Sequence, residues 1–385
     1  MNHVGLHTIK IGDLGKIVTG KTPSTKQADF WDGDIPFVTP VDLQKGKRIL
    51  GTERTVTENG ANAVRGALLP PKSICVSCIG NLGYTALTTC ESVSNQQINS
   101  IVPSKDYDAD FVYYLMKSLW SVFKSLEGQS TTLSILNKTL FSKIEITVPD
   151  LETQKRIARI LSSLDDKIEV NNQINRNLEE QAKAIFKSWF VDFEPFGGKQ
   201  PDDWETISFS SFLKPRREKS SDPSIPLFAV TNNGIIPRDE KFKKNLSRTG
   251  AQNKVAYRTD MLFGMSREIL NWGIMQEEKG CISSAYHVFA VSDDIDSQYL
   301  ELYIKANIGY FKDLIRPAAR EGQGLDQQAL MSKEILLPPE DIISAYHNIA
   351  DPTFVKIQQI NTENKTLSTL RDTLLPKLMS GEIEI

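Results

Sequence analysis

The second half of this chain repeats the order of its first half. Landmarks along one helical stretch return, in the same register, about 190 positions later. The matching landmarks are Pro149, Lys167, Asn175 and Leu178 in the first stretch and Pro338, Lys356, Asn364 and Leu367 in the second. Two copies at so long a period indicate a duplicated module rather than a solenoid. Because 385 residues exceed the size at which a single core usually keeps growing, we expect two globular regions with helical connectors.

Both helical stretches have a seam of residues at alternating steps of four and three, a spacing that defines one face of an α-helix. The predicted seam positions are Leu164, Ile168, Asn171, Asn175, Leu178, Ile185, Ile357, Ile360, Asn364, Leu367 and Leu374. We expect the two helices to pair with each other as an antiparallel coiled coil. Asn175 and Asn364 occupy equivalent seam positions, where a buried amide penalises wrong registers, although both could instead face solvent.

Capping signals give the expected bounds of the long helices. Asp351 followed by Pro352 is typical of a helix start, and the stretch from Ser162 to Asp165 is also rich in capping residues. These positions predict a helix of about 28 residues in each half, about 42 Å long at about 1.5 Å per residue. Gly381 is expected to end the second helix.

The predicted fold class is α+β. It consists of two globular regions separated by the two long antiparallel helices, with a pseudo-two-fold internal repeat. The expected boundaries are 1–148 for the first globular region, 149–192 for the central helical region, 193–337 for the second globular region and 338–385 for the distal helical region.

Composition adds few constraints. The net charge of −3 gives no overall indication of a nucleic-acid partner, yet lysines and arginines cluster at 45–48 and 214–219, as solvated loops or as a footprint for phosphates. No apolar run approaches the roughly 18 to 20 residues that span a bilayer, so we expect a cytoplasmic protein. Cys75 and Cys78 form a C-x-x-C without a second pair, which favours packing over a zinc or redox site.

Several runs resemble the specificity subunits (HsdS) of type I restriction-modification systems. The segment 148–161 (VPDLETQKRIARIL), followed by Leu164-Asp165, resembles the PLPPLxEQKRIAxIL…LD run that closes each target-recognition domain in that family. The segments 19–24 (TGKTPS), 29–38 (DFWDGDIPFV), 80–83 (GNLG) and 94–97 (SNQQ) resemble the opening and middle of such a domain, and 374–383 (LLPKLMSGEI) resembles the family's C-terminal ending. The second half departs from this pattern at 214–217 and 338–343.

The resemblance implies a non-catalytic subunit that reads a bipartite, asymmetric site in double-stranded DNA, one part with each target-recognition domain. It implies two copies of an adenine methyltransferase subunit as partners, which bind S-adenosylmethionine, and a motor-nuclease restriction subunit, which uses ATP and Mg²⁺. No cofactor or metal is expected on this chain itself. A helix of about 42 Å corresponds to about 12 base pairs of B-form DNA, which suggests that the helices act as a ruler for the gap.

Residues that read bases donate or accept hydrogen bonds in pairs, and lysine, arginine, serine and threonine flank them on phosphates. Loops that offer such side chains supply the candidate DNA-binding residues. They are Lys21, Thr22, Thr39, Asn81, Gln96, Gln97, Arg216, Arg217, Thr231, Asn232, Asn233, Arg267, Arg320 and Gln323. The glycines at 20, 80 and 83 are expected to allow tight turns or close backbone approach.

Two other functions fit parts of the sequence. One is a coiled-coil scaffold that joins proteins without reading DNA. The other is a self-sufficient nuclease, because Pro149-Asp150 with Asp165-Asp166-Lys167 formally matches P-D…D-x-K. That chemistry needs carboxylates converging on Mg²⁺, whereas we expect Asp165 to cap a helix. Trp189, Phe190 and Phe193 are expected to pack against a recognition domain, with a methyltransferase docking patch as the alternative.

Overall fold

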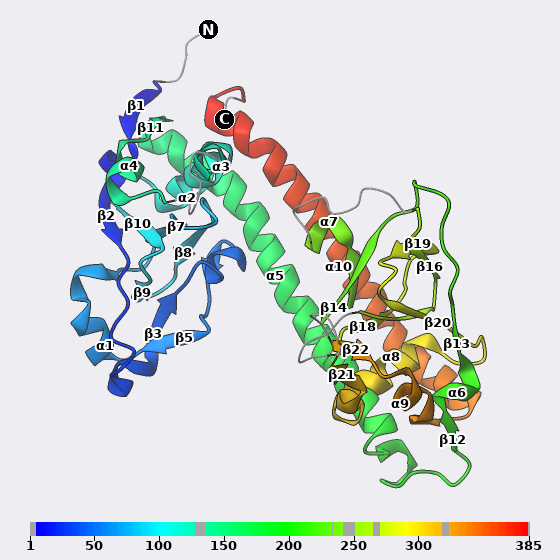
Figure 1. Cartoon of the computed structure of the whole chain (residues 1–385). Coiled ribbons are helices and arrows are strands. Elements are labelled where there is room, and N and C mark those ends of the chain that lie inside the picture. Colours follow the sequence, from blue (N-terminus) through cyan, green and yellow to red (C-terminus); the bar gives the residue numbers. More distant parts are fainter. Residues whose placement is uncertain are drawn as a thin grey trace. The chain divides into compact units, whose positions relative to one another are not determined.

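The computed structural model describes residues 5–127, 135–232, 234–241, 251–264, 270–317 and 323–383. The chain divides into two compact units (Figure 1). Unit 1 contains residues 1–175 and 358–385, and unit 2 contains residues 176–357. Each unit therefore combines one globular region with part of each long helix. Three of the candidate DNA-binding residues lie outside the described residues: Asn233, Arg267 and Arg320.

Unit 1 is built on two sheets and a short antiparallel pair of strands. The pair is β1 (His7–Lys10) with β11 (Glu145–Val148). The main sheet has the order β2 (Gly15–Thr19), β10 (Ile98–Pro103), β7 (Ile74–Ser77), β8 (Thr85–Thr88) and β4 (Arg48–Ile49). The second sheet has the order β5 (Arg54–Val56), β3 (Trp31–Val38), β9 (Ser92–Ser94) and β6 (Leu68–Leu69). The helices of the globular part are α1 (Glu58–Ala63), α2 (Ala109–Ser118), α3 (Trp120–Glu127) and α4 (Lys138–Lys143).

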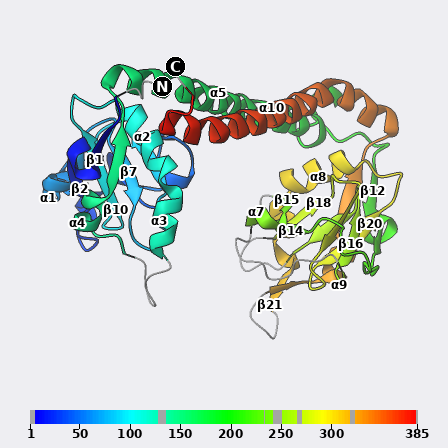
Figure 2. The ribbon, with the colours of Figure 1, turned by 90° about the horizontal axis from the view of Figure 1, so that it is seen from above.

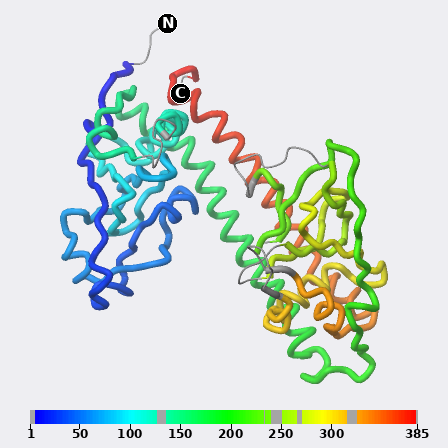
Figure 3. Tube along the Cα trace, viewed as in Figure 1, coloured from blue at the N-terminus to red at the C-terminus, as the bar shows by residue number. Residues whose placement is uncertain are grey.

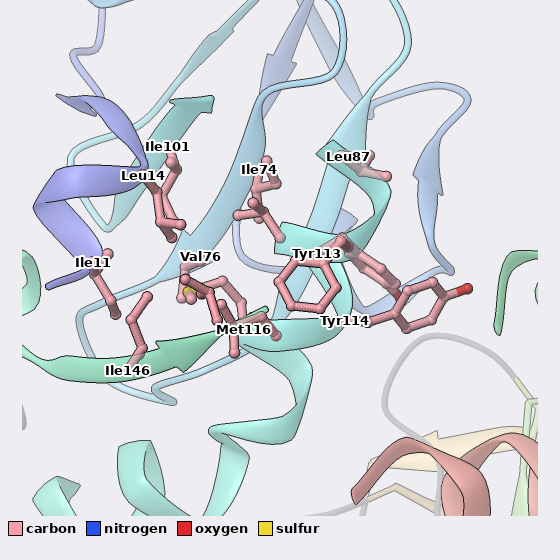
Figure 4. Packing of buried hydrophobic residues seen from close by; sticks show 14 of the residues in the cluster. Ile11, Leu14, Ile74, Val76, Leu87, Ile101, Tyr113, Tyr114, Met116 and Ile146 are labelled. Atoms are coloured by element: carbon pink, nitrogen blue, oxygen red, sulfur yellow. The ribbon is translucent and has the colours of Figure 1, made fainter. Parts of the chain in front are cut away.

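Helix α2 covers the main sheet and forms the centre of the unit 1 core (Figure 4). Asp108 starts this helix because its side chain accepts a hydrogen bond from the backbone N–H of Phe111. The helix then buries Tyr113, Tyr114 and Met116 against Ile74 and its neighbours in the sheet. The core thus fixes α2 against the strands from one side and leaves Tyr114 facing the long helices.

Unit 2 repeats this order of elements. The short pair is β12 (Glu205–Ser208) with β23 (Glu334–Leu337), and the main sheet has the order β13 (Leu213–Pro215), β20 (His287–Val291), β17 (Met261–Phe263) and β18 (Trp272–Ile274). This matches β2, β10, β7 and β8 of unit 1, strand for strand. The remaining elements are α6 (Phe209–Phe212), β14 (Phe228–Thr231), β15 (Gly234–Pro237), α7 (Arg238–Lys241), β16 (Lys254–Tyr257), β19 (Lys279–Ile282), α8 (Ser297–Ala306), β21 (Ile315–Pro317), β22 (Gln323–Leu325) and α9 (Gln327–Ser332). The α+β class and the internal repeat are confirmed.

The long helices are α5 (Leu151–Phe190) and α10 (Glu340–Ser380), of 40 and 41 residues. The expectation of about 28 residues is therefore wrong, because neither helix begins at the internal capping signals. Asp150 starts α5, accepting from the backbone N–H and the hydroxyl of Thr153 at 3.0 and 2.9 Å. In α10, Pro352 lies inside the helix, where burial of Tyr346 and Ala350 on one side and Ile360 on the other outweighs the lost hydrogen bond. Gly381, with φ of 74°, follows the last turn as expected.

The two long helices run antiparallel (Figures 1 and 2). In unit 1, Asn171 donates to Asn364 at 2.8 Å and Asn175 donates to Asn361 at 2.8 Å, so rising numbers in α5 meet falling numbers in α10. In unit 2, α5 and α10 are also in contact, with the rings of Phe186 and Tyr346 6.0 Å apart. The antiparallel pairing is confirmed. The described N-terminal and C-terminal segments both belong to unit 1 and lie near each other (Figure 3).

Candidate nucleic-acid interface

Loops from four strands of unit 1 meet at one edge of its main sheet. Because β10 is antiparallel to both β2 and β7, the loops after β2 and β7 lie beside the loop that precedes β10. Backbone hydrogen bonds join them: Gly20 donates to Ile98 at 3.0 Å, and Cys78 donates to Gln97 at 2.7 Å. The loop after β3 is joined as well, since Asn95 donates to Val38 at 3.0 Å. We call the loops 20–24, 39–42, 78–83 and 95–97 the first loop edge.

All six candidate residues of the first half lie on this edge. They are Lys21, Thr22, Thr39, Asn81, Gln96 and Gln97. The side chains of Lys21, Asn81 and Gln96 are exposed, whereas the other three are partly buried. The sequence did not show that loops so far apart would converge, because the convergence depends on the order of strands in the sheet.

Internal hydrogen bonds distinguish the six residues. The Thr22 hydroxyl donates to Gln96 Oε1 at 2.6 Å, which holds the exposed glutamine in place. Thr39 donates through both its backbone N–H and its hydroxyl to Asp42, at 2.9 and 2.8 Å, and so fixes its own loop. Gln97 Oε1 accepts from Asn95 at 2.9 Å. Lys21, Asn81 and Gln96 are therefore the members best placed to meet a partner.

Two glycines make the close approach of these loops possible. A Cβ at Gly20 would lie 2.0 Å from the carbonyl oxygen of Asn95, far inside van der Waals contact. Gly83 has φ of +90°, and a Cβ there would meet the ring of Phe123 at 2.9 Å. A side chain at Gly20 would push its loop away from the loop 95–97, and one at Gly83 would push the loop 78–83 away from α3, so both glycines have the role expected for them.

The corresponding edge of unit 2 holds two of the second-half candidates. Arg216 follows β13, and its guanidinium donates to Asp260 at 2.7 and 3.0 Å while stacking over Tyr257. Because Asp260 is buried, this bidentate pair holds Arg216 in the fold. Arg217 is exposed beside it. Arg217 is therefore the better placed of the two for a phosphate or a base.

The other described second-half candidates lie on hairpins. Thr231 is buried at the end of β14, and its hydroxyl donates to the carbonyl of Gly234 at 2.9 Å. Asn232, in the turn that follows, is exposed. Gln323 begins β22, which pairs with β21. A Cβ at Gly264, just after β17, would lie 3.0 Å from Val230 Cβ, so the end of β14 lies beside the end of β17 in the main sheet.

A buried ionic cluster fastens the globular part of unit 1 to its helices. Asp165 of α5, expected to be a helix cap, instead lies in the middle of α5 and is buried. Its two carboxylate oxygens accept from the hydroxyl of Tyr114 and from the guanidinium of Arg371 in α10, both at 2.6 Å. Burial, followed by the charge of Asp165, raises the pKa of Tyr114, so its hydroxyl stays protonated and donates. We call Tyr114, Asp165 and Arg371 the first joint.

Further ion pairs reinforce the first joint one turn away. The Nζ of Lys47 contacts Asp110 at 2.5 Å and Ser162 Oγ at 2.6 Å, and its side chain is 2% exposed. Arg48 reaches Asp166 and Glu169 of α5, at 2.7 and 2.8 Å. Lys47 and Arg48 belong to the basic cluster at 45–48, for which a solvated loop or a phosphate footprint was expected, but both are engaged by acidic residues that lie far away along the chain. A charged residue at a seam position, Arg371, was the available signal.

Unit 2 fastens its globular part to the helices differently. His347 of α10 contacts Asp296 at 3.0 Å through Nε2 and Asp351 at 2.8 Å through Nδ1. Asp296 also starts α8, accepting from the backbone N–H of Tyr299 at 2.6 Å. We call His347, Asp296 and Asp351 the second joint. Asp351, expected to start a helix, serves here as the partner of a histidine.

Aromatic side chains surround the second joint and form one cluster. Phe190 lies 5.0 Å from both Tyr299 and Tyr346, measured between ring centroids. Trp189 packs on Tyr346, and Phe193 packs on Trp204. The residues at the end of α5 thus pack against the globular part of unit 2, as expected.

The cysteines and acidic residues show no sign of metal chemistry in the described parts of the chain. Cys75 and Cys78 are buried, and desolvation raises the pKa of their thiols to about 12 and about 11. No group of histidine, cysteine and carboxylate ligands suited to a metal ion occurs among the described residues. Within those same ranges, no helix has the length and apolar character required to cross a membrane.

Comparisons with known proteins agree with this architecture. The family model for the type I restriction modification DNA specificity domain matches residues 4–180. The type I restriction enzyme MjaIX specificity subunit of Methanocaldococcus jannaschii is 28% identical over 98% of this chain and 93% of that protein. The HindI specificity subunit of Haemophilus influenzae is 36% identical, over 44% of this chain and 38% of that protein.

A solved structure shows the same fold. The type I restriction-modification S subunit from M. genitalium matches with a TM-score of 0.56 at 15% identity, covering 98% of this chain and 97% of that one. The sequence matches and the structural match therefore agree with each other, and both agree with the duplicated sheets and paired helices of this chain. Residues 4–180 thus match the DNA specificity domain of type I restriction-modification systems, and the whole chain is similar along its length to a specificity subunit of such a system.

Proposed function

We propose that this subunit reads a split site in duplex DNA, one part with each globular region, and that the helix pair sets the gap. The observation that carries this proposal is the duplicated main sheet, β2-β10-β7-β8 and β13-β20-β17-β18, each with candidate readers on loops at the same edge. Specificity subunits are the non-catalytic, DNA-recognising components of type I systems. Two equivalent but chemically different edges are suited to two different half-sites.

The proposed division of labour follows the expected boundaries. Regions 1–148 and 193–337 would be the target-recognition domains, and regions 149–192 and 338–385 would be the connecting helical regions. In support, α5 begins at Leu151 and ends at Phe190, and α10 begins at Glu340. Both ends of α5 pack into the globular parts. The gap between the two DNA half-sites would therefore depend on where each globular part is attached to the helices. The estimate of about 12 base pairs, which used helix length alone, no longer applies.

At the first loop edge, the exposed amides of Asn81 and Gln96 would read base edges in the major groove. Such amides donate and accept in pairs, and each good contact discriminates by about 1 to 3 kcal/mol. Lys21, exposed on the neighbouring loop, would contact a phosphate. In unit 2 the exposed Arg217 and Asn232 would contact bases or phosphates. The candidates Asn233, Arg267 and Arg320, which lie outside the described residues, would join them.

As a specificity subunit, the chain works with DNA and the other components of a type I system. The finer proposal is that two methyltransferase subunits bind, one to each repeat, because a duplicated chain offers two equivalent surfaces. S-adenosylmethionine would then belong to the methyltransferase subunits, and ATP with Mg²⁺ to the restriction subunit.

Methylation mapping tests the proposed site. The full chain is produced in cells with the methyltransferase subunit of its own system, and methylated adenines are mapped across the genome. One asymmetric motif of two short sequences with a fixed gap is expected. A continuous motif would overturn the split-site proposal, and no motif together with no footprint on DNA would favour a protein scaffold.

The ruler is tested separately by inserting four residues after Asn171, within the region where α5 and α10 pair. About one added turn of helix shifts the two globular regions apart, so the gap should change while both half-sites stay the same. An insertion after Lys105, in the exposed turn between β10 and α2 at the far end of the sheet from the first loop edge, is the matched control, since it lengthens neither long helix. A change in the half-site bases after the helix insertion would contradict the ruler.

A further inference from the structure

One turn of α5 meets both the globular part of unit 1 and the opposite helix. Asp165 holds Tyr114 of α2 with one carboxylate oxygen and Arg371 of α10 with the other. The side chains of Asp165 and Arg371 are 7% and 15% exposed, so the pair is shielded from water. The three residues come from α2, α5 and α10. If any one of these helices moves relative to the other two, a hydrogen bond to the carboxylate of Asp165 is lost.

We propose that the first joint is a register lock, through which Tyr114, Asp165 and Arg371 together select a single gap between the half-sites. This inference rests on the proposed split-site function and names the residues that would set its gap. Sliding α10 along α5 by one helical turn moves Arg371 by about 5.4 Å, beyond reach of the carboxylate. Rotating α2 away from α5 removes the hydroxyl of Tyr114 from the same group. Either movement leaves a buried carboxylate short of a partner, which is strongly unfavourable.

The other contacts between the helices are weaker selectors of register. Lys167 and Glu363 lie 3.6 Å apart and are about half exposed, so solvent can replace either partner. Asn171 and Asn175 are buried and donate to Asn364 and Asn361, so they also disfavour a wrong register, but a neutral amide that loses its partner costs less than an ionised carboxylate that does so. Asp165 is different because its partners are of two chemical kinds on two elements. The buried pair therefore gives the lock its selectivity.

The decisive test compares Arg371→Met with Arg371→Lys in the complex with methyltransferase subunits. Duplexes carry the native half-sites with gaps from two base pairs shorter to two longer than the native gap, and methylation rates are measured in competition. For Arg371→Met, the preference for the native gap should fall about tenfold, while discrimination within each half-site is unchanged. Arg371→Lys keeps the charge and should recover most of the preference. A merely structural residue would lower all rates together.

The matched control is Lys167→Met, which removes the exposed ion pair between the same two helices and should leave the gap preference as in the wild type. If Arg371→Met does not assemble, the double replacement Asp165→Leu with Arg371→Leu is measured instead. It buries apolar groups where the ion pair was and should show the same loosened gap.

The outcomes separate this inference from the function on which it rests. A wild-type complex that methylates no split site would contradict the proposed function itself. A wild-type complex with one preferred gap, alongside an Arg371→Met or double-leucine complex that keeps that preference, would overturn the register lock alone.

Discussion

Both joints fasten the helix that follows the main sheet, α2 or α8, to a long helix, but they are made of different chemistry. In unit 1, α2 is fastened to α5 through carboxylates, lysine and arginine, with Lys47 and Asp165 buried. In unit 2, α8 is fastened to α10 through His347 and a cluster of aromatic rings that meet edge-on or tilted. The same backbone arrangement therefore tolerates either directional ionic contacts or broad apolar packing. Duplication has kept the topology, while each copy has its own means of attachment.

The largest expected effect is the loss of an aromatic ring from the cluster beside the second joint. Phe190→Ala removes a buried ring that contacts Tyr299, Tyr346 and Trp204, and should lower the free energy of unfolding of unit 2 by about 3 to 5 kcal/mol. Chemical denaturation followed by tryptophan fluorescence measures it. The control is Val191→Ala next to it, which is 39% exposed and should cost less than about 1 kcal/mol. Equal costs would mean that the aromatic cluster does not hold the second joint.

A smaller loss is expected when the first joint loses its carboxylate. Asp165→Ala leaves Tyr114 and Arg371 without their shared partner and should cost about 3 kcal/mol in unit 1. The adjacent Asp166, whose side chain is 48% exposed, contacts Arg48, and Asp166→Ala should cost less than about 1 kcal/mol. Amide hydrogen exchange in α2 reports the loss locally. If Asp166 proved the costlier of the two, the assignment of the first joint would be wrong.

The sequence predicted what depends on periodicity and missed what depends on distant partners. The repeat, the antiparallel helices and the glycine at 381 follow from spacing and from capping rules, which act over a few residues. The helix break near Pro352 was wrong because packing of Tyr346 against α5 overrides a local signal. The role of Asp165 could not be foreseen, since its partner Arg371 lies 206 positions away.

The candidate interface shows the same division. Side-chain chemistry alone selected the polar loop residues, and in unit 1 the strand order brings all six to one edge. In unit 2, chemistry alone could not separate Arg216 from Arg217. Arg216 is engaged by Asp260, 44 positions away, and Arg217 is exposed. Strand order and long-range ion pairs are properties of the folded chain, so no local pattern reveals them.

The smallest expected effect is a pH dependence of the stability that the second joint contributes through His347. Burial alone would lower the pKa of His347, but its hydrogen bonds and the charges of Asp351 and Asp296 outweigh burial, so the pKa is raised above the ordinary 6.5. The ring of Tyr346 neighbours that of His347. Burial raises the pKa of the Tyr346 hydroxyl, so it does not titrate near neutrality. The first joint contains no histidine.

A raised histidine pKa stabilises the fold where the side chain is protonated in both states. The contribution of the second joint is therefore fully present below pH 6.5 and is lost as the pH rises through the raised folded value. Because His347 is partly solvated, screening limits the effect to about 1 kcal/mol or less. The difference in unfolding free energy between wild type and His347→Gln, measured from about pH 5.5 to 8.5, should shrink with rising pH. A difference for His347→Gln that stays constant or grows with pH would contradict the titrating second joint.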